Sequence, residues 1–85
     1  LVPSNTRYAL RAAECFLDMH EANRAWEYAE RALSSSGERA DVLITASLVL
    51  VEKGEKSKAR PYVEKARALE PNDPRVKKLI TRVLT

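Results

Sequence analysis

Small and apolar residues recur at helical spacing in two neighbouring segments of the chain. Gly54 separates the two segments, and Pro71 follows the second one. This pattern predicts a hairpin of two helices over residues 40–73, with the two apolar faces packed on each other. The facing positions are Leu43, Ala46, Ser47 and Leu50 in the first helix, and Ala59, Val63 and Ala66 in the second.

The same arrangement occurs once more, earlier in the chain, where Ala9 corresponds to Leu43. Ala9 precedes Leu43 by 34 residues, an interval that we call the repeat period. One repeat period before each facing position of the hairpin stands another small or apolar residue. The sequence therefore predicts two copies of one helical hairpin. The equivalent residues are Ala9, Ala12, Ala13 and Phe16, followed by Ala25, Ala29 and Ala32.

This period and these residues resemble the tetratricopeptide repeat, a helix–turn–helix unit that stacks into solenoids. In the second copy Leu43, Ser47 and Pro71 occupy the large, small and closing positions of the pattern. The resemblance implies an all-α fold, a right-handed α–α superhelix of five helices, that works as a protein-interaction scaffold. The whole chain, residues 1–85, would form one domain, with repeats at 6–39 and 40–73 and a capping helix at 74–85.

Turn residues place the ends of the helices. We expect helices from a cap at residues 3–5 to about 19, and over about 22–35, 38–53, 55–69 and 75–84. Gly37 suits a left-handed conformation that ends the second helix. Pro61 lies inside the fourth helix, where its ring disrupts the hydrogen-bond ladder, so we expect a bend there.

The junction between the repeats depends on Trp26 and Leu33, which lie two helical turns apart in the second predicted helix. In an array of this kind that side meets the next repeat, so we expect these residues to pack on Val42 and Val49. The alternative is that Trp26 is an exposed anchor for a partner.

Composition restricts the function. A chain of 85 residues forms a small core and leaves no room for a catalytic cavity. Hydrophobic residues make up 45% and charged residues 32%, which is typical of a folded domain rather than a disordered one. The most apolar run, residues 42–51, is too short to cross a bilayer, so we expect no membrane span. We favour a cytoplasmic location and interpret the chain as a piece of a longer protein.

Charge is distributed unevenly. Residues 1–52 hold five Arg against eight Asp and Glu, whereas residues 53–85 hold ten basic residues against four acidic ones. A basic second half is compatible with nucleic-acid binding, but only Tyr62 accompanies it, without the aromatic residues that stack on bases. We interpret the charges as a solvated face and regard nucleic acid as an unlikely partner.

Candidate catalytic and metal-binding residues are few. Cys15 and His20 are the single residues of their types, so neither a disulfide nor a metal site with His or Cys ligands is expected. We interpret Cys15 as a small apolar residue that packs in the fold. His20 lies in the first hairpin turn, at the position that Gly54 occupies in the second. We expect neither an enzyme nor a cofactor.

The third predicted helix carries more apolar surface than its hairpin partner and the repeat junction cover. In the family the remaining side lines the concave groove. Burial of each such side chain is worth about 1.5–3 kcal/mol, so something is expected to cover them. The resemblance implies a partner-binding site of Leu10, Leu17, Ile44, Leu48 and Val51, with Glu14, Asp18 and Glu52 at its rim.

Three interpretations of this apolar stripe remain open. It binds a protein or peptide partner, an amphipathic helix or an extended apolar segment. It joins two copies of the chain as a homodimer. It is covered by further repeats or by other parts of a longer protein. Family members that hold a C-terminal carboxylate use basic groove residues, whereas Leu10, Glu14, Ile44 and Leu48 stand at the matching positions, which disfavours that ligand.

Overall fold

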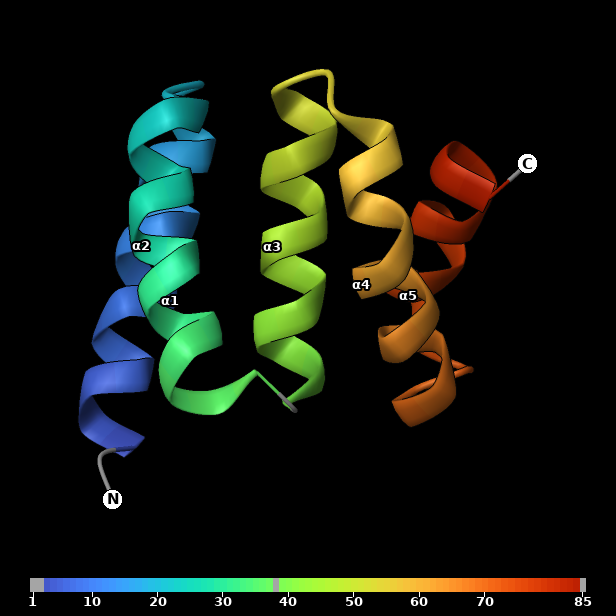
Figure 1. Cartoon of the computed structure of the whole chain (residues 1–85), viewed down its shortest axis with the longest axis horizontal. Coiled ribbons are helices and arrows are strands. Elements are labelled where there is room, and N and C mark those ends of the chain that lie inside the picture. The colour runs from blue at the N-terminus through green and yellow to red at the C-terminus, as the bar shows by residue number, and fades with distance from the viewer. Residues whose placement is uncertain (1–2, 38, 85) are drawn as a thin grey trace.

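Five helices make up the computed structural model, which describes residues 3–37 and 39–84. In Figure 1, α1 and α2 overlap on one side, α3 lies in the centre, and α4 and α5 lie on the other side. This architecture confirms the predicted all-α fold of helical hairpins. The helices are α1 (Pro3–Asp18), α2 (Ala22–Ser36), α3 (Ala40–Glu52), α4 (Lys56–Leu69) and α5 (Pro74–Leu79), which continues as the π-helical segment η1 (Ile80–Leu84).

The turns of the two hairpins have the same backbone structure. His20 and Gly54 both adopt left-handed conformations, with φ of 60° and 79°. In the first turn the N–H of Glu21 donates to the carbonyl of Phe16 at 2.8 Å, and in the second the N–H of Glu55 donates to that of Leu50 at 2.8 Å. These bonds define a Schellman motif, which ends a helix and reverses the chain.

Helix α3 is buried on almost every side. From Val42 to Leu50 only Leu48 keeps appreciable exposure. A helix that is apolar around its circumference needs cover in several directions. In this chain α2, α4, α1 and α5 all contact α3. The central position of α3 in Figure 1 follows from its composition.

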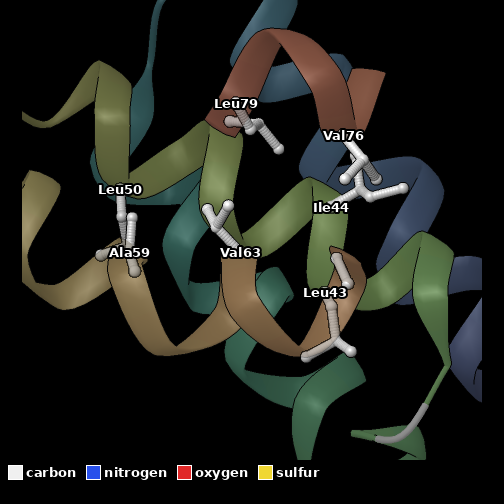
Figure 2. Close-up of a cluster of buried hydrophobic side chains, with 8 residues drawn as sticks. Leu43, Ile44, Leu50, Ala59, Val63, Val76 and Leu79 are labelled. Carbon is white, nitrogen blue, oxygen red and sulfur yellow. The ribbon is translucent and has the colours of Figure 1, made fainter. Parts of the chain in front are cut away.

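The largest core cluster joins α3, α4 and α5. Figure 2 shows Leu43 and Ile44 of α3 beside side chains of α4 and α5. Each large aliphatic side chain buried here stabilises the fold by about 1.5–3 kcal/mol. The cluster therefore fixes the C-terminal helix to the second hairpin. Its buried members are Leu43, Ile44, Leu50, Ala59, Val63, Ala66, Val76 and Leu79.

The first hairpin packs through alanines instead. Ala13, Ala25 and Ala29 are fully or almost fully buried between α1, α2 and α3. Without long side chains, the helix backbones approach closely and gain dispersion contacts. The Thr6 hydroxyl, which is buried, lies 2.6 Å from the Ser35 hydroxyl and so joins the start of α1 to the end of α2.

The repeat junction agrees with the prediction. Trp26 and Leu33 pack against the cluster that contains Ala46 and Val49. Leu33 also packs against the cluster that contains Val42. Both side chains are half-buried, so Trp26 serves as a packing residue between the hairpins rather than as a fully exposed anchor.

Gly37 corrects one prediction. Its φ is −66°, an ordinary right-handed value, so the expected left-handed cap is wrong. The residue is constrained by space instead, because a Cβ atom at this position would lie 2.7 Å from the backbone oxygen of Leu33.

Pro61 does not interrupt α4, which is helical from Lys56 to Leu69. Its exposed ring supplies no N–H for the carbonyl of Ser57, one helical turn earlier. The bend expected at this position stays a prediction.

Candidate protein-binding face

The eight residues predicted to bind a partner come from two neighbouring helices. Leu10, Glu14, Leu17 and Asp18 lie on α1, and the other four lie on α3. The two helices contact each other. At one end, Nδ1 of His20 lies 3.2 Å from Oε2 of Glu52, which joins the turn after α1 to the end of α3.

Ile44 is not a binding residue in this fold. It has no exposed surface and belongs to the cluster that contains Val76 and Leu79 of α5 (Figure 2). The prediction assumed that the chain covers two sides of α3, but α5 covers a third. Leu10 is also buried, with 9% of its surface exposed, so neither residue offers appreciable surface to a ligand.

The other six residues keep exposed surface. Leu17, Leu48 and Val51 are half-buried, and each packs against a core cluster. Three carboxylates beside them are exposed. The six residues, which we call the inner face, are Glu14, Leu17, Asp18, Leu48, Val51 and Glu52.

Helix α5 adds basic residues that the sequence analysis did not assign to the site. Arg75 is held first by hydrogen bonds to Asp73, and the charges of Glu14 and Asp41 act on it as well, so its pKa is raised. Arg75 and Asp41 line the same surface hollow, so the Arg75 side chain lies beside the start of α3. Lys78 follows Arg75 by three residues, so it lies on a neighbouring part of the same side of α5.

The Asp73 side chain fixes the start of α5. Its Oδ1 accepts a hydrogen bond from the backbone N–H of Arg75 at 2.8 Å, and its Oδ2 accepts one from the Arg75 guanidinium at 3.0 Å. These bonds stabilise the ionised carboxylate and lower the pKa of Asp73. The cap therefore orients both the helix and the Arg75 side chain.

Comparison with known families agrees with this geometry. A sequence model of the tetratricopeptide repeat matches residues 16–83, most of the chain. The chain belongs to the tetratricopeptide-repeat family. No curated protein and no solved structure matches it. Tetratricopeptide repeats generally mediate protein–protein interactions and generally form non-enzymatic scaffolds.

The match explains the role of α5. In the two hairpins α1 and α3 are the first helices, and α5 begins one repeat period, 34 residues, after the start of α3. One further repeat period carries Ile44 onto Lys78, and Asp41 onto Arg75. The repeat period was the sequence pattern that could have assigned α5 to the inner side of the array.

Three further features bear on a second site in the part of the chain that the structure describes. Cys15 is exposed, so its interpretation as a packing residue is wrong. Within residues 3–37 and 39–84, no three His, Cys, Asp or Glu side chains are grouped so that they could hold a metal ion. Among the helices described, none combines the length and apolar composition that a membrane span requires.

One surface hollow lies beside the two hairpin turns, and His20, one of its lining residues, contacts Glu52 at the end of the inner face. Charged side chains line it, and they pair with one another. Nε of Arg24 lies 3.4 Å from Oε1 of Glu21, and Nζ of Lys53 lies 3.8 Å from Oε2 of Glu55. Because these partners already neutralise each other, the hollow offers little uncompensated charge to a ligand.

Proposed function

We propose that this chain is a protein-interaction module whose inner face binds an amphipathic or apolar segment of a partner protein. The observation that carries the proposal is the combination of Leu17, Leu48 and Val51, half-exposed on adjacent first helices, with carboxylates next to them. A partner side chain that covers this remaining apolar surface gains free energy in proportion to the area removed from water.

The structure changes the expected depth of this site. Ile44 and Leu10 are buried, so the ligand contacts a shallow apolar surface instead of a stripe of five aliphatic side chains. The packing of the inner-face side chains on the core favours binding, because side chains already held in place lose little conformational entropy when a partner binds. We therefore expect modest affinity and a short ligand.

Peptide selection tests the proposal. Short random peptides displayed on phage are selected on the purified chain, and the affinities of enriched peptides are then measured for three proteins. Leu48→Ala is expected to weaken binding about tenfold, because it removes a central apolar contact. Leu69→Ala is the matched control, because Leu69 is an exposed leucine of α4, 49% accessible, outside the inner face.

Two results would overturn the proposal. One is equal weakening by Leu69→Ala and Leu48→Ala. The other is that bound peptides perturb the amide resonances of α2 and α4 but not those of α1 and α3. A dilution series by light scattering tests the alternative, a homodimer through the same residues. A dimer that dissociates in Leu48→Ala and competes with peptide would assign the inner face to self-association.

A further inference from the structure

We propose that the inner face and the adjoining side of α5 together select a partner segment with a dipolar charge pattern. Such a segment carries basic groups at one end, acidic groups at the other end, and apolar residues between them. This inference rests on the proposed function and specifies the ligand of the same site. It follows from the way charges of opposite sign are divided between α1 and α3 on one side and α5 on the other.

The acidic side comes from α1 and α3. Glu14, Asp18 and Glu52 are exposed and stand at the rim of the inner face. Asp18 and Glu52 occupy equivalent positions of the two repeats, so they lie at the same end of neighbouring helices. We call these three residues the acidic edge. A positive group of a ligand placed there meets several negative charges.

The basic side comes from the C-terminal helix. Arg75 and Lys78 lie on α5, and Arg82 follows one turn later in η1. All three are exposed. We call them the basic edge. Arg75 and Asp41 of α3 line the same surface hollow, so the start of the basic edge lies beside α3.

Several of these charges have no close partner of opposite sign. Among the described residues, Asp18, Lys78 and Arg82 form no ion pair within the chain. Free charges that a ligand engages without first breaking an internal pair give the clearest discrimination between ligands. Leu48 and Val51 lie on α3 together with Glu52, and α3 lies between α1 and α5 (Figure 1). A ligand that crosses from α1 over α3 to α5 thus meets acidic groups and apolar surface first and basic groups last.

The opposite charges of the acidic edge and the basic edge argue against two other ligands. A nucleic acid is negative along its whole length, so the acidic edge would repel it. An entirely basic segment would meet repulsion at the basic edge in the same way. A second copy of this chain carries both charge types, so it remains the competing occupant that the experiment must separate.

The test uses three synthetic peptides with the same leucine centre. One carries lysines at one end and glutamates at the other, the second carries lysines at both ends, and the third carries glutamates at both ends. Affinities are measured by fluorescence anisotropy at low and high salt. We expect the dipolar peptide to bind about tenfold more tightly than either uniform peptide at low salt, and the difference to shrink at high salt.

A charge-reversal variant sharpens the test. Lys78→Glu/Arg82→Glu makes the basic edge acidic, so its preference is expected to change to the peptide with lysines at both ends. Lys56→Glu/Lys65→Glu makes the same net change on α4, and both of these lysines are exposed and form no ion pair among the described residues. The control is expected to keep the dipolar preference.

The outcomes separate the two proposals. If peptides bind in a Leu48-dependent manner but the three charge patterns are equivalent, or both double variants behave alike, the charge inference is wrong and the proposed function stands. If no peptide binding depends on Leu48, both fail. If the dipolar peptide only displaces a dimer seen by light scattering, the occupant is a second copy, and the partner inference is overturned.

Discussion

His20 and Gly54 occupy the same backbone position in successive repeats, both in the left-handed region and both in a Schellman turn. Glycine adopts this conformation without steric penalty, whereas a residue with a Cβ atom crowds its own backbone. The two repeats therefore differ in the strain of an otherwise identical turn. His20 has a compensating contact, because its Nδ1 lies 3.2 Å from Oε2 of Glu52.

We expect His20→Gly to stabilise the fold by about 0.5–1 kcal/mol. The substitution removes left-handed strain of about 1 kcal/mol or more. It also removes the contact with Glu52, but the His20 side chain is 82% exposed, and exposed ion pairs contribute little. Urea unfolding followed by circular dichroism measures the change. A loss of stability would mean that the contact with Glu52 outweighs the strain.

The converse change, Gly54→Ala, is expected to destabilise the fold by about 1 kcal/mol. A Cβ atom at this position meets nothing within 4 Å, so the effect comes from the backbone conformation and not from a clash. The same unfolding experiment measures it. Gly54→Asn provides the control, because Asn tolerates the left-handed region better than Ala and should lose less stability. Equal losses for both variants would contradict this explanation.

The sequence predicted the fold because the determining features are local and repeated. Ala9 and Leu43 stand at equivalent positions of the two repeats, and each marks the hairpin side of its helix. The ends of the helices were predicted to within two residues, but the backbone conformation at one of them was not. Gly37 illustrates this. A glycine at the end of a helix suggested a left-handed cap, whereas the structure requires only a small residue close to the Leu33 carbonyl.

The candidate site was harder to predict because it depends on which helix covers which side of α3. Ile44 looked available when only α2 and α4 were counted as neighbours. The α5 helix supplies Val76 and Leu79 to the same cluster and buries Ile44. The spacing of apolar residues within one helix does not show which distant helix will bury them. The repeat period was the pattern that could have placed α5 beside α3.

Ile44→Val is expected to lower the free energy of unfolding by about 1 kcal/mol while leaving peptide affinity unchanged. The substitution removes one methylene from a fully buried side chain, and such changes typically cost about 0.5–1.5 kcal/mol. Leu48→Ala is expected to change peptide affinity more than it changes the free energy of unfolding. Urea unfolding and anisotropy on the same samples give both quantities. An Ile44→Val protein of unchanged stability and weakened binding would restore Ile44 to the ligand surface.

Acid is expected to weaken the start of α5 through Asp73. The hydrogen bonds from Arg75 lower the pKa of Asp73 below its ordinary value of 3.8. A carboxyl whose folded pKa is depressed contributes stability above its unfolded pKa, and this contribution is lost as pH falls through the folded value. The loss therefore occurs below about pH 4, not near neutrality.

Asp73→Asn isolates this effect. Asn keeps a side-chain acceptor for the helix cap but cannot ionise, so the variant is expected to be less stable than the parent at about pH 6 and to approach it at about pH 2. Urea unfolding across that pH range measures the difference. Glu64→Gln is the control, because Glu64 is an exposed carboxylate with only a long contact of 3.9 Å to Arg60. A constant difference between Asp73→Asn and the parent at all pH values would show that the bonds from Arg75 do not depend on the charge of Asp73. In that case the cap acts through geometry alone, and the position of Arg75 beside Asp41 must come from the packing of Val76 against the core.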